Sequence, residues 1–218
     1  CQTLFPYTTL VRSEDTSSFK VPCVIVTTSA ENWSMEELSS VSIDDEKAGE
    51  TIVDYLIEHG HTKIAEIGAN LELSQTARLR HNGYLNSLKK HGITPDERYY
   101  ERARFSYDSA YRAMKKLLEK DIEITAVYAI SDVMAIGALR AILDKGLRVP
   151  EDISITGFDG STLAEYYNPK IVSIRQPHKD MAARSVELLF NMIDLHKGSC
   201  HEIIPFELTE GKSVARID

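Results

Sequence analysis

Short apolar runs alternate with amphipathic helical segments along most of the chain, and this alternation limits the possible folds more than any other feature. The runs that we predict as strands are residues 21–28, 41–44, 63–68, 124–130, 152–159 and 171–177. Between them, apolar residues recur at helical spacing, and predicted helices end at Gly60, Gly92 and Gly146. Strands separated by helices form βαβ units, and nearly all-apolar strands indicate a parallel sheet covered on both faces. We therefore expect an α/β fold with mostly parallel sheets flanked by helices.

The C-terminal part of the chain continues this pattern after residues 171–177. The last predicted helix ends at Gly198, and its apolar stripe consists of Val186, Leu189, Phe190 and Ile193. Residues 201–210 follow as a predicted closing strand. No internal repeat or low-complexity tract interrupts the alternation.

The composition indicates a globular protein that does not hold nucleic acid by itself. The chain has 218 residues, 43% of them hydrophobic, and a formal net charge of −8, so its surface as a whole repels phosphate backbones. The cysteines Cys1, Cys23 and Cys200 are an odd number without paired spacing, which favours a reducing compartment over a disulfide framework. No apolar stretch approaches the roughly 20 residues that a membrane span requires. We therefore expect a cytoplasmic location and no membrane partner.

The N-terminal segment does not fit the alternation. Residues 1–13 show neither strand alternation nor a helical face, and a polar stretch follows them. We interpret residues 1–20 as a disordered or foreign segment. The alternative is a frayed native terminus.

Several ordered motifs carry a resemblance to a known family. Residues 146–160, GLRVPEDISITGFDG, combine a helix stop, an X-Pro turn, a buried strand and a carboxylate at the end of that strand. Four more segments follow the same order and spacing: VSIDDEKAGETIVDYLIEHGHTKIAEIG, TARLRHNGYLNSLKKHGI, AVYAISDVMAIGALRAI and NPKIVSIRQPHKDMAARSVELL. Together they resemble the LacI/GalR (lactose-repressor/galactose-repressor) family of transcription regulators from about residue 21 to the C-terminus. Several motifs in order are far more specific than any one of them.

The resemblance implies a two-lobed fold like that of periplasmic sugar-binding proteins, with a small ligand in the cleft between the lobes. It assigns residues 21–69 and 177–200 to the N-terminal lobe, and residues 70–176 and 201–218 to the C-terminal lobe. The family's helix-turn-helix headpiece, hinge helix and first βαβ units do not precede residue 21. We therefore expect the N-terminal lobe to be incomplete in this chain.

Open α/β sheets bind ligands at the carboxyl ends of their strands, and this rule nominates residues at four strand ends before any resemblance is used. Asp44, Asp159 and Gln176 each end a predicted strand, and Ser131 with Asp132 follows another. Such side chains supply the donors and acceptors that a polyhydroxylated ligand requires. The alternative for Asp44, Ser131 and Asp159 is a helix N-cap. Some members of the family carry Asn in place of Ser131, which leaves its contact open.

The resemblance adds Arg80 and Phe105. Arg80 begins RHNGY, which matches the family's ligand-contacting RxxGF-like motif, and its planar fork can bracket two neighbouring oxygens. The alternative is a surface arginine paired with a nearby Glu, the role expected of Arg78. Phe105 lies where family members place an aromatic ring against the ligand, and the alternative is core packing.

No motif indicates catalysis, a metal or a cofactor. The seven histidines form no i, i+4 pair and no zinc spacing with cysteines. A GxSxG elbow, a GxGxxG loop and a Walker loop are all missing from the sequence, and no nucleophile accompanies the carboxylates. We therefore expect a protein that is not an enzyme and that binds no cofactor.

The sequence thus predicts the effector-sensing domain of a LacI-type regulator. A carbohydrate or nucleoside-like effector would change the angle between the lobes, and operator DNA would be bound only through a headpiece outside this chain. The family pairs through its core lobes, so a homodimer is expected, with Tyr166 and Tyr167 as a candidate part of the contact. The alternative is a periplasmic sugar-binding protein of an ABC transporter.

Overall fold

The computed structural model of the chain describes residues 22–29, 38–194 and 198–217. The predicted foreign segment, residues 1–20, lies outside these residues. The chain forms two compact units. The first unit is drawn from Cys1–Asp44 and Pro177–Pro205, and the second from Asp45–Gln176 and Phe206–Asp218.

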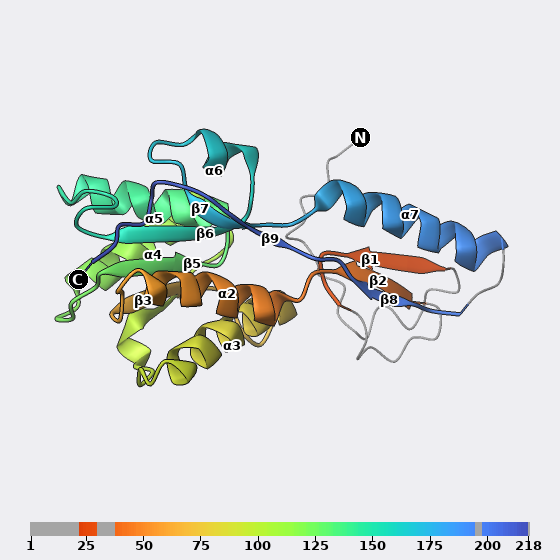
Figure 1. The fold of residues 1–218 in the computed structure, drawn as a ribbon, viewed down its shortest axis with the longest axis horizontal. Coiled ribbons are helices and arrows are strands. Elements are labelled where there is room, and N and C mark those ends of the chain that lie inside the picture. The colour runs from red at the N-terminus through yellow and green to blue at the C-terminus, as the bar shows by residue number, and fades with distance from the viewer. Residues whose placement is uncertain (1–21, 30–37, 195–197, 218) are drawn as a thin grey trace. The chain divides into compact units, whose positions relative to one another are not determined.

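In its described residues, 22–29, 38–44, 177–194 and 198–205, the first unit shows a three-stranded parallel sheet and one helix (Figure 1). The strands, in the order β1-β2-β8, are β1 (Cys23–Val26), β2 (Leu38–Ser42) and β8 (His201–Ile203). Helix α7 (His178–Asp194) packs on β1 and β2.

The apolar stripe predicted for α7 is wrong. The helix buries Met181, Leu188 and Met192, whereas Val186, Phe190 and Ile193 are about half exposed. The reason is that the helix carries two apolar stripes, and the sheet packs against the stripe formed by Met181, Leu188 and Met192, which follow one another at intervals of seven and four residues. The Ser39 hydroxyl of β2 lies 3.1 Å from the Met192 sulfur, on the buried side.

The second unit contains a six-stranded sheet in the order β4-β3-β5-β6-β7-β9. Its first five strands are parallel, as predicted, and β9 is antiparallel to β7. The strands are β3 (Ile64–Gly68), β4 (Tyr100–Arg102), β5 (Ala126–Ala129), β6 (Ser154–Asp159), β7 (Val172–Arg175) and β9 (Glu207–Thr209). The helices are α2 (Asp45–Glu58), α3 (Gln75–Lys90), the 3₁₀ turn η1 (Glu97–Tyr99), α4 (Tyr107–Glu119), α5 (Asp132–Asp144) and α6 (Thr162–Tyr166).

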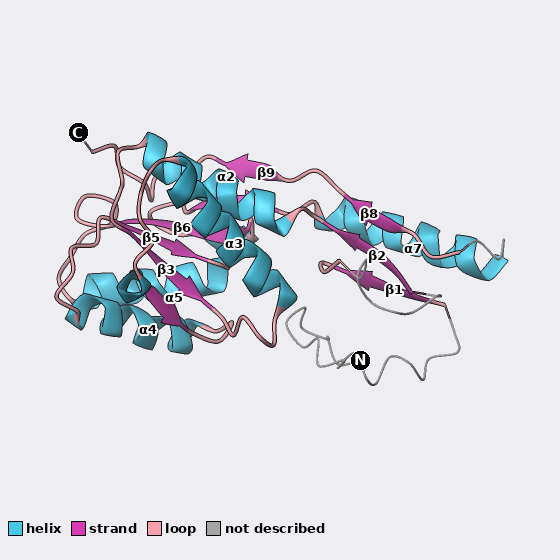
Figure 2. Ribbon diagram, turned by 90° about the horizontal axis from the view of Figure 1, so that it is seen from below, coloured by secondary structure: helices cyan, strands magenta, loops and turns pink. Residues whose placement is uncertain are grey.

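Helices cover both faces of this sheet (Figures 1 and 2), which explains why its strands are nearly all apolar. Tyr84 of α3 stacks on Tyr128 of β5 on one face. Thr156 pairs with Tyr128 and shares that face, so its neighbour Gly157 points to the opposite one, where it meets Asp132 and Ala135 of α5. Helix α2 packs mainly against α3, and helix α4 packs mainly against α5.

Two predicted boundaries differ from the structure. Residues 45–69 were assigned to the first lobe, but α2 packs on α3 and β3 pairs with β5, so both belong to the second unit. The predicted closing strand 201–210 is two strands, β8 in the first sheet and β9 in the second. Pro205 lies between them, and proline has no N–H with which to continue a ladder.

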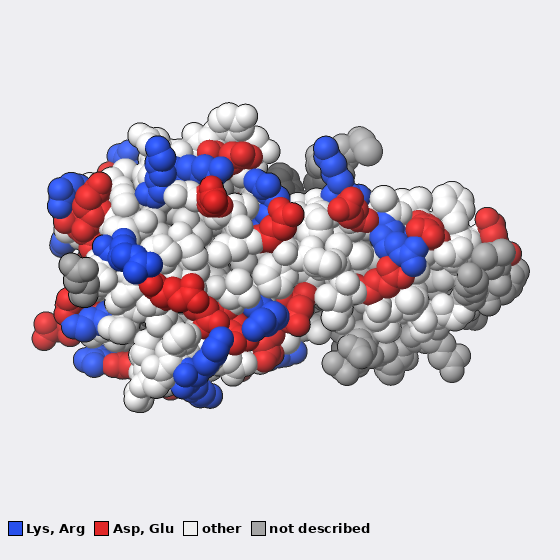
Figure 3. All heavy atoms as spheres, in the orientation of Figure 1, with Lys and Arg blue, Asp and Glu red and all other residues white. Residues whose placement is uncertain are grey.

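The surface carries charges of both signs. In the view of Figure 3, acidic and basic side chains are interspersed over the second unit. Among the described residues, no helix is both long enough and apolar enough to cross a membrane.

Candidate ligand-binding site

The parallel strands of the second unit bring most of the predicted ligand-contacting residues to one edge of the sheet. Strand β5 is followed by Ile130 and Ser131, β6 ends at Asp159, and β7 is followed by Gln176. Because parallel strands end at the same edge, these residues lie near one another, at the edge where open α/β sheets bind ligands.

Two glycines allow helices α2 and α3 to place Arg80 at this edge. A Cβ atom on Gly83 would lie 2.2 Å from the carbonyl oxygen of Glu46, and one on Gly49 would lie 2.6 Å from that of Arg80. The two helices therefore cross backbone against backbone, where no side chain fits. This close packing sets Arg80, in the second turn of α3, beside Asp45 at the start of α2.

Arg80 is buried and held from several sides, with 3% of its surface exposed. Its Nε donates to Asp45 Oδ1 at 2.8 Å and its Nη1 donates to the carbonyl oxygen of Ile130 at 2.6 Å. Nη1 also lies 3.7 Å from Asp159 Oδ1. The guanidinium carbon is 3.5 Å from the centre of the Phe158 ring, a cation–π contact. The alternative of a surface arginine paired with a Glu is therefore wrong for Arg80, whereas Arg78 is exposed.

The neighbouring carboxylates keep Arg80 charged. Burial acts to lower its pKa, but the charges of Asp45 and then Asp159 outweigh burial, so the pKa is raised. An immobile guanidinium with fixed partners can present its remaining N–H groups in one geometry.

Asp159 is joined to Gln176 as well as to Arg80. Gln176 Nε2 donates to Asp159 Oδ1 at 2.8 Å, and the two residues are 5% and 8% exposed. Asp159 has φ of +111°, a region that residues other than glycine rarely adopt, and Gly160 follows with φ of +65°. The N-cap of α6 is Ser161, whose hydroxyl accepts from Ala164 N, so the N-cap alternative for Asp159 is wrong.

Asp132 fixes the loop that follows Asp159. Its carboxylate accepts from Ser161 N and from the Ser173 hydroxyl, both at 2.6 Å, and Ser173 in turn accepts from Gly160 N. Burial and then the charge of Asp159 raise the pKa of Asp132 to about 6. The loop conformation thus depends on a buried carboxyl group that changes charge near neutral pH.

The other three predicted residues are placed less centrally. Ser131 is fully buried and caps α5 by accepting from Met134 N, which confirms the N-cap alternative. Phe105 is half-buried in the segment between β4 and α4, so its contact with a ligand stays a prediction. Asp44 is exposed and belongs to the first unit, and the residue that meets Arg80 is its neighbour Asp45.

A row of buried polar side chains crosses the same sheet face as Phe158. Glu66, Tyr128 and Thr156 are neighbours across β3, β5 and β6. Glu66 Oε2 is hydrogen-bonded to His81 Nδ1 at 2.6 Å. Among the described residues, Glu66 Oε1, the Tyr128 hydroxyl and Thr156 Oγ1 have no hydrogen-bond partner. Tyr84, by contrast, donates its hydroxyl to the Ile64 carbonyl oxygen at 2.8 Å.

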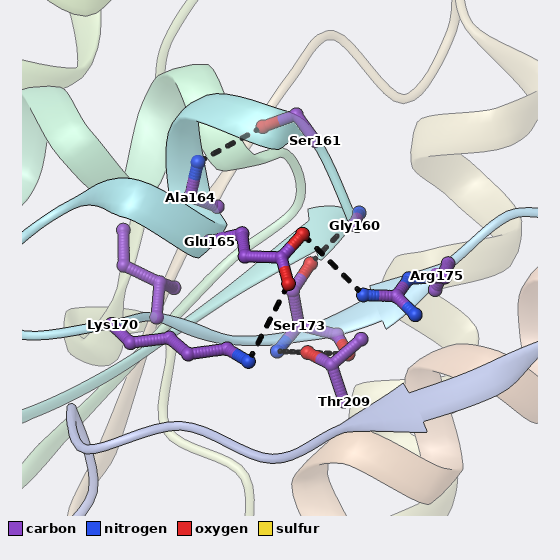
Figure 4. Close-up of a pocket in the computed structure, with 9 residues that line it drawn as sticks. Gly160, Ser161, Ala164, Glu165, Lys170, Ser173, Arg175 and Thr209 are labelled. Atoms are coloured by element: carbon purple, nitrogen blue, oxygen red, sulfur yellow. Dashed lines mark hydrogen bonds and ion pairs between the residues drawn. The ribbon is translucent and has the colours of Figure 1, made fainter.

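A small, open hollow lies beside the Asp159 loop, and Figure 4 shows its lining. The carboxylate of Glu165 reaches toward Lys170 and Arg175, with a separation of 3.9 Å to each. None of the predicted ligand-contacting residues lines this hollow. In the described part of the chain, no group of three or more His, Cys, Asp or Glu side chains could hold a metal ion.

Comparison with known proteins gives a consistent result. Residues 53–214 match the family model described as "Periplasmic binding protein-like domain". The chain is 37% identical over 210 residues to the HTH-type transcriptional regulator MalR of Clostridium butyricum, a match that covers 96% of this chain and 62% of that protein. The chain thus spans less than two thirds of the length of this relative.

Solved structures agree with the sequence relatives. A transcriptional regulator CelR–cellobiose complex superposes with a TM-score of 0.80 and 28% identity, covering 88% of this chain and 65% of that one. A sugar-binding transcriptional regulator of the LacI family from Escherichia coli, complexed with phosphate, superposes with a TM-score of 0.77 and 27% identity, covering 90% and 69%. The α/β fold with parallel sheets flanked by helices is thereby confirmed.

Proposed function

Because the chain belongs to the periplasmic-binding-protein-like domain family of LacI-type transcriptional regulators, we propose that it senses a small sugar-like effector at the carboxyl edge of its six-stranded sheet. One observation carries this proposal: Asp159 joins Arg80 and Gln176 at that edge, through an ion pair of 3.7 Å with Arg80 and a hydrogen bond of 2.8 Å from Gln176. The group combines fixed donors with fixed acceptors, as recognition of a polyhydroxylated molecule requires. The CelR complex with cellobiose supports a carbohydrate effector.

In the whole protein, the effector would control operator DNA binding by a helix-turn-helix headpiece. The relative MalR carries the HTH designation, and this chain covers 62% of that relative. The net charge of −8 fits a sensing domain that leaves DNA contacts to another part. A homodimer would let two headpieces meet two half-sites. Tyr166, 82% exposed, is a candidate contact residue for such a dimer.

The alternative, a transporter's solute-binding protein, is not favoured, because the curated relative and the two solved structures are transcriptional regulators. The same comparisons support a role that is not enzymatic. A search for turnover of any sugar that binds would separate sensing from catalysis.

Calorimetry with a panel of sugars and nucleosides tests the proposal. We expect at least one compound to bind saturably, and Arg80→Ala and Asp159→Ala each to weaken it by about 1–3 kcal/mol, the cost of leaving a buried polar partner unsatisfied. Arg78→Ala is the matched control, since Arg78 is exposed on the same helix, and it should leave the affinity unchanged. Unchanged affinity in both site variants would disprove the assignment.

A further inference from the structure

Asp132 supports the loop that begins at Asp159. It lies in the first turn of α5 and is 1% exposed, and a Cβ atom on Gly157 of β6 would lie 2.3 Å from its Oδ1. Its Oδ2 accepts from Ser161 N and its Oδ1 accepts from the Ser173 hydroxyl, both at 2.6 Å. One buried carboxylate therefore ties the segment after β6 to strand β7.

The supported loop contains a residue in an unfavourable backbone conformation. Asp159 has φ of +111°, and such a conformation persists in a residue other than glycine only where its surroundings impose it. On one side, Gln176 N donates to the Asp159 carbonyl oxygen at 3.2 Å. On the other side, Gly160 N donates to Ser173 Oγ at 3.1 Å (Figure 4). Because Ser173 is itself bonded to Asp132, the conformation of Asp159 depends on Asp132.

The Asp132 carboxyl group has a different bonding arrangement in each protonation state. As a carboxylate it accepts two hydrogen bonds, from Ser161 N and from the Ser173 hydroxyl. As an acid it can still accept from Ser161 N, but a proton on Oδ1 must be donated to Ser173 Oγ. The Ser173 hydrogen then turns to the Ile174 carbonyl oxygen, 3.4 Å away. Since Ser173 Oγ also accepts from Gly160 N, this change reaches the residue next to Asp159.

The charge of Asp159 links Asp132 to the effector site. Burial and then the charge of Asp159 raise the pKa of Asp132 to about 6, while the hydrogen bonds from Ser173 and Ser161 act to lower it. Asp159 is thus the charged group that faces Asp132 from β6, and β7 and the start of α6 present hydroxyl and N–H groups. An effector that donates a hydrogen bond to Asp159 would weaken the repulsion between the two carboxylates. Effector binding would then release a proton from Asp132.

We propose that Asp132 is a positioning residue of the effector site, which holds the Asp159 loop in one of two arrangements according to its protonation, and that the carboxylate arrangement binds the effector more tightly. This inference rests on the proposed function and adds a regulation of the same site. Asp132 acts through Asp159 and has no need to touch the effector. Effector affinity should therefore rise as the pH increases through about 6.

Amide NMR shifts test the loop part of the inference without an effector. The N–H groups of Ser161 and Gly160 should titrate with a midpoint near pH 6, because Asp132 and Ser173 are their acceptors. In Asp132→Asn these shifts should stay constant from pH 5 to pH 7. Ser173→Ala removes a bond that lowers the pKa of Asp132, so it should move the Ser161 midpoint to higher pH. A constant Ser161 shift in the unmodified protein would overturn the inference.

Calorimetry with cellobiose and with ribose from pH 5 to pH 7.5 tests the effect on binding. For a sugar that binds, we expect the affinity to rise by about threefold or more, as a pKa change of about half a unit gives. Asp132→Asn imitates the acid form, because its amide can donate to Ser173 Oγ and accept from Ser161 N. Its affinity should therefore stay near the pH 5 value at every pH. Asp108→Asn is the matched control, an exposed carboxylate in the first turn of α4, and should keep the pH dependence.

The outcomes separate the inference from the proposed function. Sugar binding that is independent of pH, or that keeps its pH dependence in Asp132→Asn, would overturn the inference and leave effector sensing intact. If neither sugar binds, the proposed function loses support, and the amide shifts then decide on the inference. If Asp132→Asn does not fold, the direction of the midpoint change in Ser173→Ala decides instead.

Discussion

The hydroxyl of Tyr128 gives the sharpest test of the packing described above. It is fully buried on β5 and has no hydrogen-bond partner among the described residues. A buried hydroxyl without a partner costs about 1–3 kcal/mol relative to water. Tyr128→Phe keeps the ring and its stacking on Tyr84 and removes only this cost. We therefore expect the free energy of unfolding to rise by about 1 kcal/mol.

Tyr84→Phe is the matched control, since its ring lies on the same sheet face and its hydroxyl is bonded to the Ile64 carbonyl oxygen. Loss of that bond should lower the free energy of unfolding by about 1 kcal/mol, so the two variants should differ by about 2 kcal/mol with opposite signs. Urea unfolding followed by circular dichroism measures both. Native-state hydrogen exchange at the β5 amides reports the stability of the six-stranded sheet alone.

The result that would refute this reasoning is a Tyr128→Phe variant as unstable as Tyr84→Phe. It would mean that the Tyr128 hydroxyl forms a hydrogen bond worth as much as the one made by Tyr84. A change within about 0.3 kcal/mol of zero would mean that the hydroxyl is partly solvated, which its burial contradicts.

Two more predictions concern the surroundings of the site. Gly83→Ala should lower the free energy of unfolding by about 2 kcal/mol or more, because the new Cβ would lie 2.2 Å from the Glu46 carbonyl oxygen and must push α2 away from α3. Urea unfolding measures this change. A loss below about 0.5 kcal/mol would show that the two helices can separate freely. Asp132 has its pKa raised from 3.8 to about 6, so the native state holds its proton more tightly, and stability should fall as pH rises from about 4 to about 6, by up to about 3 kcal/mol for this group. Asp132→Asn should remove that part of the pH dependence, and an unchanged stability–pH curve in the variant would assign it to other groups.

The sequence predicted the second unit well because its signals are local. Apolar strands, helical periodicity and glycine helix ends are each properties of a short segment, and the parallel sheet follows from their order. Arg80, Asp159 and Gln176 were predicted from strand ends and from motifs, and the structure brings these three together. Whether they contact an effector remains a prediction.

The sequence could not predict what depends on contacts between distant segments. Asp44 and Asp45 are adjacent carboxylates, and only the crossing of α2 with α3 makes Asp45 the partner of Arg80. The buried side of α7 depends on which of two apolar stripes faces β1 and β2. Phe158 beneath Arg80 was predicted only as part of a strand. Nothing in a single segment distinguishes these choices.

Strand β9 has a consequence for the order in which the protein is synthesised and folded. Residues 206–217 return to the second unit after α7 and β8 have been made. There the Ser213 hydroxyl donates to the Ile155 carbonyl oxygen and accepts from Val172 N, which joins β6 to β7. On the ribosome, the larger sheet therefore keeps an open edge at β7 until residues 206–217 have been made. A chain released before residue 207 would expose that edge to pairing with other nascent chains.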